Sequence, residues 1–454
     1  MLRSCRVTVF WLLALGFSMA TFAGSAPASD RIVVMISVDG LASFYFNDPQ
    51  AEMPAIRRLA QEGARSTMMR ASTPTVTWPN HTTLVTGVNP AKHGVTGNNC
   101  FDRASRQRLT FISDPVFDKD QIVRVPTLYD LAKAQGLRTA AIRWPATRNA
   151  KSLDWTLPDM KTASSTTNYC TASLLDECEG EAIHIRAGYD HGTVDDDMVT
   201  RVFLLLLRKN HPNLALLHIA NVDHVQHKKG PRTPEAYRAI QAADQQVGAV
   251  WEELQKDYPG KATLFIVSDH GFSPIAHTVL PKVVLRQAGL LKAGNDENSD
   301  PIQIVTQGGA AFIYILDAAH RAELASQMVR ALSKAEGISK VVGPEQFEAY
   351  GVGNPAKDPR APDLIAFAEE GCAFGNTSNG EEPFTGKVEI LGTHGHDPAL
   401  PHLHATFVAW GCGIKPGTTL GEISNTSVAP TLAELLQMQL PDQDGPVLSS
   451  LLAK

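Results

Sequence analysis

The chain has 454 residues, of which 43% are hydrophobic and 19% are charged, and its formal net charge is −6. This composition is typical of a globular protein and excludes a disordered or fibrous chain. A protein that binds nucleic-acid backbones would normally be basic, so no nucleic-acid polymer is expected as a partner. Six cysteines are too few for a disulfide-built fold. The length predicts one large domain with an insertion or a second lobe.

The first residues have the pattern of a targeting segment. Arg3 and Arg6 precede an almost entirely apolar run over 7–20, which small residues follow. A membrane anchor would need roughly 20 apolar residues, so we expect a cleaved signal peptide over residues 1–23 and no stable membrane anchor. The mature protein is then expected in the periplasm or outside the cell. Disulfides form there, and a bond between Cys170 and Cys178 is one expectation.

Strand and helix patterns alternate from residue 32 onward. Strands are expected at 32–38, 137–143, 213–219, 262–267 and 405–410, and helices at 53–62, 126–135, 195–209, 233–257 and 427–436. This alternation predicts an α/β fold with a mostly parallel central sheet and helices on both faces.

One stretch departs from that alternation. Residues 281–359 predict a small inserted α+β subdomain, so that residues 30–280 and 360–454 form the core. The pattern of the main sheet is expected to resume at 363–367.

Acidic and histidine side chains follow the ends of the predicted strands, with one pair expected in a loop after 213–219. They are Asp39, Asp223, His227, Asp269, His270 and His394. Ligands of open α/β sheets bind outside the carboxyl ends of the strands, so these six side chains are expected to converge. Any one of them alone would be an ordinary cap or a solvated loop residue. Together, carboxylates and imidazoles suit Zn²⁺ or a similar metal, and two such ions can hold a phosphoryl group.

Thr77 stands where a helix is expected to begin, because Pro79 fits the first turn of a helix. A threonine hydroxyl is a poor nucleophile unless a metal or a base lowers its pKa. A metal held by Asp39, Asp269 and His270 would do so. Taken alone, Thr77 would only cap the helix, but beside these groups it becomes the candidate nucleophile.

These residues belong to a series of short motifs that extends over nearly the whole chain. The series comprises Val38-Asp39-Gly40, Thr77-Trp78-Pro79-Asn80-His81, Thr86-Gly87, His93-Gly94, Asn98, Asp223 with His227 and Gly230-Pro231, Ser268-Asp269-His270-Gly271, and His394-Gly395. In this order the series resembles the type I phosphodiesterase/nucleotide pyrophosphatase family of the alkaline phosphatase superfamily. The resemblance implies a hydrolase with an alkaline-phosphatase-like fold.

The resemblance also implies two zinc ions, or other divalent transition metals, held by two sets of side chains. The sets are Asp223, His227 and His394 for site 1, and Asp39, Asp269, His270 and the Thr77 oxygen for site 2. Asn98 would donate to a non-bridging phosphate oxygen. Thr77 would attack phosphorus to form a phospho-threonine, which water then hydrolyses.

The implied substrate is a small phosphate diester or a nucleotide. Trp78 matches the aromatic residue after the nucleophile and is expected to stack on a base or an aryl leaving group. Many relatives that cleave nucleotides have a tyrosine five residues before the site 1 aspartate, where it helps to hold the base. Here that residue is His218, which leaves the nucleotide specificity open. Residues of about 145–190 and 280–360 are expected to build the pocket.

The residues disfavour one alternative activity, that of a sulfatase, and leave a second one open, that of a phosphomonoesterase. A sulfatase needs a cysteine or serine nucleophile with an arginine four residues later, whereas this chain has Thr77 and His81. A phosphomonoesterase stays open, because Arg143, Arg148 and Lys151 could bind a dianion, although a solvated loop is the simpler interpretation. A non-catalytic metal-binding protein is the remote alternative, and it should lack a ligand or the nucleophile.

Overall fold

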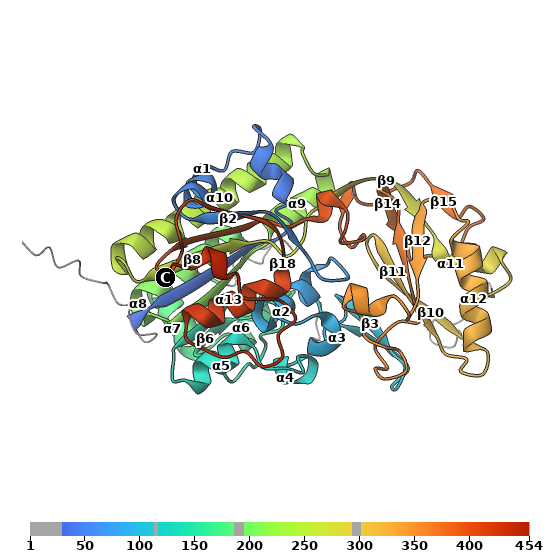
Figure 1. Ribbon diagram of the computed structural model, residues 1–454, viewed down its shortest axis with the longest axis horizontal. Coiled ribbons are helices and arrows are strands. Elements are labelled where there is room, and N and C mark those ends of the chain that lie inside the picture. The colour runs from blue at the N-terminus through green and yellow to red at the C-terminus, as the bar shows by residue number, and fades with distance from the viewer. Residues whose placement is uncertain (1–29, 113–116, 186–194, 293–300, 454) are drawn as a thin grey trace, which may run out of the picture.

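The computed structural model describes residues 30–112, 117–185, 195–292 and 301–453. The predicted signal peptide therefore lies outside the described residues. An eight-stranded sheet forms the larger lobe (Figure 1). In sheet order its strands are β18 (Thr418–Ser424), β2 (Ala64–Arg70), β17 (Phe407–Gly411), β8 (Ala262–Val267), β1 (Ile32–Val38), β7 (Leu214–Ile219), β5 (Thr139–Ile142) and β6 (Trp155–Leu157).

The centre of this sheet is parallel. β1 pairs in parallel with β7 and with β8, so that Val38 lies beside Ile219 and Ser37 lies beside Val267. The carboxyl ends of the three strands consequently meet at one edge. β17 runs antiparallel to both of its neighbours. The predicted α/β fold with a mostly parallel sheet is confirmed.

Helices cover both faces of the sheet. Successive side chains of β1 point to opposite faces, and both sets are apolar, so each face is buried against helices. Val34 and Ile36 pack against one set of helices, and Val33 and Met35 pack against the other. The first set is α1 (Pro54–Glu62), α8 (Asp196–Asn210) and α10 (Pro234–Asp257), and the second is α2 (Thr77–Thr86), α5 (Leu128–Ala134) and α13 (Val428–Leu435).

Two helices differ from the sequence prediction. α5 begins at Leu128, because Thr127 and Asp130 form a capping box, and Pro126 therefore precedes the cap instead of lying in the first turn. The segment after β7 is a helix, α9 (Asn221–Lys229), where we expected a loop. Asp223 and His227 lie on α9.

A second lobe contains a four-stranded antiparallel sheet with its own apolar core. It is built from β10 (Ile302–Gln307), β11 (Ala310–Ile315), β13 (Leu364–Ala368) and β12 (Ile338–Val342), with α11 (Pro281–Gln287) and α12 (Arg321–Leu332) packed on it. The prediction that 363–367 returns to the main sheet is wrong, since β13 pairs with β11 and β12. All residues of β13 are buried, and such an apolar strand fits either sheet equally well.

A small sheet joins the two lobes. Its strands are β9 (Ser273–Val279), β14 (Gly371–Phe374), β15 (Phe384–Thr385) and β16 (Gly392–Thr393). β9 continues the chain that leaves β8, and β16 pairs with its first residues. This pairing returns the segment after β16 to the edge where β1, β7 and β8 end.

The predicted disulfide is not formed, since Cys170 and Cys178 are both free thiols. Cys170 follows α6 (Ala163–Tyr169) and donates its thiol to the Thr171 carbonyl, whereas Cys178 on α7 (Ala172–Gly180) is buried in the main core. Among the described helices, none combines the length and the apolar character that crossing a membrane requires.

Candidate active site

The six acidic and histidine side chains predicted from the strand ends come together at the carboxyl edge of the main sheet. Asp39 directly follows β1, and Asp269 and His270 follow β8. α9 supplies Asp223 and His227 from the end of β7, and the loop after β16 supplies His394. The ligand atoms of Asp39, Asp269 and His270 form one group compact enough to hold a metal ion, and those of Asp223, His270 and His394 form a second. His227 lies beside Asp223 and His394 of the second group.

Asp39, Asp269 and His270 form the inner group. The Nε2 atom of His270 lies 3.4 Å from Asp39 Oδ1 and 3.1 Å from Asp269 Oδ2. Ligands about 2.0 Å from a tetrahedrally coordinated zinc ion would be about 3.3 Å apart, so the spacing fits such an ion. These three atoms are buried and have no hydrogen-bond partner among the described residues. A cation between them would satisfy all three.

Asp223, His227 and His394 form the outer group. Asp223 Oδ1 lies 3.3 Å from His227 Nε2 and 3.4 Å from His394 Nε2, and the two histidine nitrogens are 3.2 Å apart. Asp223 and His227 share one face of α9, because they are four residues apart. The ring of His394 stacks on that of His270 with centroids 3.7 Å apart, which places the two groups side by side.

The hydrogen bonds of the three histidines orient their Nε2 atoms toward the carboxylates. His227, His270 and His394 each have Nδ1 at 2.9 or 3.0 Å from a backbone carbonyl oxygen, to which Nδ1–H donates. The lone pair of each Nε2 therefore faces the other ligand atoms. Metal-binding histidines commonly donate their second nitrogen in this way. The donor set of the two groups fits Zn²⁺ or another first-row divalent metal.

Burial and charge shift the pKa values of these groups in different directions. Burial raises the pKa of Asp39 and Asp269 well above the usual range, and the neighbouring carboxylate of Asp223 adds to the effect on Asp39. Burial also acts to raise the pKa of Asp223, but His227 beside it holds that pKa well below the usual range. Burial lowers the pKa of His270. The inner group thus crowds buried carboxylates that are costly without a cation.

Thr77 is the first residue of α2 and lines the same cavity as Asp39 and Asp223. The N-cap is Val76, which makes no side-chain cap bond, so Thr77 itself is not the cap. The side chain is therefore not engaged in capping and stands at the positive end of the helix. This end favours a negatively charged phosphoryl group.

The amide of Asn98 lies beside Thr77. Its Oδ1 accepts a hydrogen bond from the backbone N–H of Trp78 at 2.9 Å. Because the atom that accepts this bond must be the amide oxygen, the other terminal atom of the side chain is Nδ2, which is a donor. The role predicted for Asn98 needs that donor.

Trp78 lies outside the cavity beside Thr77. Its side chain is 2% exposed and packs with Val95, Cys100 and Phe111 in a separate apolar cluster. Stacking of Trp78 on a substrate stays a prediction and requires the ring to leave this cluster.

His218 lines the cavity, but both of its nitrogens contact the protein. Nε2 lies 2.9 Å from Asp39 Oδ2, and Nδ1 lies 3.1 Å from the Arg143 carbonyl oxygen. The ring of His81 packs against it with centroids 4.4 Å apart. His218 consequently holds the oxygen of Asp39 that faces away from the inner group.

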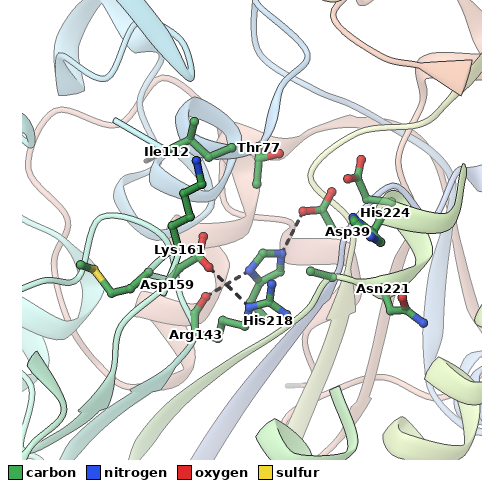
Figure 2. A pocket seen from close by; sticks show the side chains of 12 residues that line it. Asp39, Thr77, Ile112, Arg143, Asp159, Lys161, His218, Asn221 and His224 are labelled. Carbon is green, nitrogen blue, oxygen red and sulfur yellow. Dashed lines mark hydrogen bonds and ion pairs between the residues drawn. The ribbon is translucent and has the colours of Figure 1, made fainter. Parts of the chain in front are cut away.

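The cavity beside Thr77 has a volume of about 310 Å³ (Figure 2). Besides Asp39, Thr77, His218 and Asp223, its lining comprises Ile112, Arg143, Asp159, Met160, Lys161, Ala220, Asn221 and His224. Residues 159–161 belong to the 145–190 stretch that we expected to build the pocket. Within the described part of 281–359, no residue lines it. Sequence reasoning missed Asp159, Lys161 and Asn221, and no local motif marks them.

The fold defines the class of this protein as an alkaline-phosphatase-like α/β protein. A family model described as type I phosphodiesterase/nucleotide pyrophosphatase matches residues 33–397. The chain belongs to this family, whose members are hydrolases of phosphoric ester bonds. The family and the enzyme class predicted from the sequence are both confirmed.

Relatives and solved structures agree with this assignment. An uncharacterized pyrophosphatase/phosphodiesterase of Schizosaccharomyces pombe is 26% identical over 91% of this chain and 78% of its own length. A venom phosphodiesterase of Crotalus durissus collilineatus is 27% identical over 54% of this chain, which corresponds to only 26% of that protein. The structure of murine ectonucleotide pyrophosphatase/phosphodiesterase 5 matches with a TM-score of 0.72 and 19% identity, over 93% of this chain and 100% of that chain.

Proposed function

We propose that this protein is a metal-dependent phosphodiesterase/nucleotide pyrophosphatase that cleaves small phosphate diesters or pyrophosphates through Thr77. The observation that carries the proposal is the position of Thr77, which shares a cavity with Asp39 of the inner group and Asp223 of the outer group. The spacing of the ligand atoms supports one zinc ion in each group. Bound divalent ions would supply positive charge to the phosphate and would lower the pKa of a coordinated hydroxyl.

The chain's own residues then carry a two-step displacement. The Thr77 oxygen bonds to phosphorus while the bond from phosphorus to the leaving oxygen breaks, and the leaving oxygen takes up a proton. Water then bonds to phosphorus, the bond to the Thr77 oxygen breaks, and Thr77 regains its proton. Asn98 Nδ2 donates to a non-bridging oxygen in both steps, where negative charge accumulates.

One solved structure supports the role of Thr77 by analogy. The inactive threonine-to-alanine variant of murine ectonucleotide pyrophosphatase/phosphodiesterase 5 has been solved in complex with AMP, and that chain matches with a TM-score of 0.72. By this likeness, we infer that the cavity beside Thr77 receives one of the two groups esterified to the phosphate.

Two of the three basic residues that could serve a phosphomonoesterase, Arg143 and Arg148, are already paired with carboxylates, which weakens that alternative. The Arg143 guanidinium lies 3.1 Å from Asp196 and 3.4 Å from Asp159, and Arg143 and Asp196 are buried. Arg148 lies 2.7 Å from Asp118. These arginines are therefore already paired and are poorly placed to neutralise the additional charge of a monoester dianion.

A comparison of two chromogenic substrates tests the proposal. The purified, zinc-loaded protein should hydrolyse bis-p-nitrophenyl phosphate faster than p-nitrophenyl phosphate, and a chelator should abolish both activities. A preference for the monoester would favour the phosphomonoesterase alternative. Two bound ions without turnover of a panel of diesters, dinucleotides and nucleotide sugars would favour a non-catalytic metal-binding protein.

Export is the second part of the proposal. The apolar run over 7–20 supports a signal peptide, and cleavage after residue 23 would release the enzyme into the periplasm or the medium. N-terminal sequencing of the protein recovered from these fractions should begin near residue 24. A full-length chain in the membrane fraction would contradict export as a cleaved protein.

A further inference from the structure

We propose that Lys161 makes the cavity beside Thr77 a subsite for a negatively charged group of the substrate, such as a second phosphate or a carboxylate. The inference rests on the proposed function and narrows its substrate class. The preferred substrate would then be a phosphodiester or pyrophosphate that carries another anionic group close to the reacting phosphate.

The position of Lys161 is the first observation. It lies in the segment that follows β6 and lines the same cavity as Thr77. Figure 2 shows its side chain extending toward Ile112 and Thr77, with the ammonium at the end nearest to them. A group attached to a phosphate on Thr77 would enter the space that this ammonium faces.

The other charged groups of the cavity already have partners or roles. Arg143 is paired with Asp159 and with Asp196. Asp39 and Asp223 belong to the inner and outer groups. Lys161, by contrast, makes no ion pair with any residue of the described ranges. It is therefore the cation of the lining that remains available to a ligand.

The lining offers little to an aromatic base. No phenylalanine, tyrosine or tryptophan is among the described residues that line the cavity. The His218 ring is held by Asp39 and Arg143, and His81 packs against it. Asn221 and His224 add polar groups. A small polar substituent with a charge suits this lining better than a stacked ring does.

Ile112, Met160 and Ala220 supply the apolar part of the lining. Ile112 is 39% exposed, although large apolar side chains are usually buried in this chain. A short aliphatic linker between the reacting phosphate and the second anionic group could cover it. This arrangement would bring the anion to the Lys161 ammonium.

Direct binding tests the proposal without turnover. In the Thr77→Ala background, we would measure Kd by calorimetry for dipropyl phosphate, bis(2-carboxyethyl) phosphate and bis(2-phosphonoethyl) phosphate. Symmetric diesters place the same group in the cavity in either orientation. One charge-assisted hydrogen bond predicts about tenfold tighter binding of the charged diesters, and their comparison separates carboxylate from phosphonate, which stands in for a second phosphate.

Substitutions at Lys161 assign the preference to this residue. Lys161→Gln should abolish the preference for charged diesters, Lys161→Arg should retain it, and Lys161→Glu should reverse it. Lys261→Gln is the matched control, because Lys261 is exposed, precedes β8 far from the cavity and changes the net charge equally. That control should keep the preference.

The outcomes separate this inference from the proposed function. An unchanged preference in Lys161→Gln, or equal Kd values for charged and neutral diesters in the parent, would overturn the role of Lys161. Hydrolysis of bis-p-nitrophenyl phosphate by the wild-type enzyme, measured in parallel, tests the proposed function alone. If the wild-type enzyme hydrolyses the diester but substitution of Lys161 does not change Kd, the proposed function is supported and the subsite is rejected.

Discussion

The inner and outer groups are built from different parts of the fold. The inner side chains directly follow β1 and β8, which are paired neighbours, and all three are buried. The outer side chains come from α9 and from the loop after β16, and their exposed fractions are 18% for Asp223, 28% for His227 and 8% for His394. Strand register fixes the inner group, whereas the packing of a helix and a distant loop sets the outer group. We therefore expect the outer group to be the more open to solvent and to metal exchange.

The largest effect is expected at Thr77, which lines the same cavity as Asp39 and Asp223. Thr77→Ala removes the proposed nucleophile and should lower kcat for bis-p-nitrophenyl phosphate by at least about 10³-fold. Thr82→Ala is the matched control, because Thr82 lies on the same helix and its hydroxyl donates to the Trp78 carbonyl. It should change kcat far less. Undiminished turnover by Thr77→Ala would rule out the covalent mechanism.

Removal of metal should distinguish the two groups. Brief dialysis against a chelator should first lower the metal content from about two ions per chain to about one, because solvent reaches the outer group more easily. His227→Ala should mimic this state, whereas Asp269→Asn should lose the inner ion. Elemental analysis of each protein measures the content. Loss of both ions together, in every variant and at every time of dialysis, would contradict the expectation that the inner and outer groups bind metal independently.

Substitution of His218 should change the zinc affinity of the inner group only. Its contact with Asp39 Oδ2 orients a ligand, so His218→Gln should weaken zinc binding at the inner group by about 10- to 100-fold and leave the outer group unchanged. Competition with a chromophoric zinc chelator measures both affinities. His224→Gln is the matched control, since His224 lines the same cavity outside both groups. A change in KM alone, with both zinc affinities intact, would instead support the predicted role of His218 in substrate binding.

A smaller effect is expected at His93, which belongs to neither group. It ends α3 (Pro90–His93) and supports α2 through a 3.1 Å hydrogen bond with Thr83. Burial lowers the pKa of His93 to about 3. The unfolded chain takes up this proton near pH 6.5, so the free energy of unfolding should fall as the pH drops from about 6.5 toward 3.

The slope of the free energy of unfolding against pH measures the contribution of His93. His93 alone should contribute about 1.4 kcal/mol per pH unit below pH 6, and His93→Gln should remove that part of the slope. Urea unfolding of both proteins at several pH values between 7.5 and 5 provides the comparison. Equal slopes would show that His93 is not held neutral in the folded protein.

The sequence by itself determined the elements that build the inner group. The buried runs of β1 and β8, followed by Asp39 and by Asp269 with His270, predicted both the strands and the edge where their ends meet. The reason is local, because a strand buried on both faces is continuously apolar and its polar successor marks its end.

The tertiary structure alone decided several other features. Nothing in the sequence of β13 indicates which sheet it joins, and nothing in residues 159–161 shows that Lys161 lines the same cavity as Thr77. The burial of Trp78 and the contact of His218 with Asp39 likewise depend on segments far apart in the chain. Local patterns report which face of a segment is buried, whereas its partner depends on how distant segments pack. The candidate ligands and the candidate nucleophile could therefore be named from the sequence, whereas the shape and charge of the pocket could not.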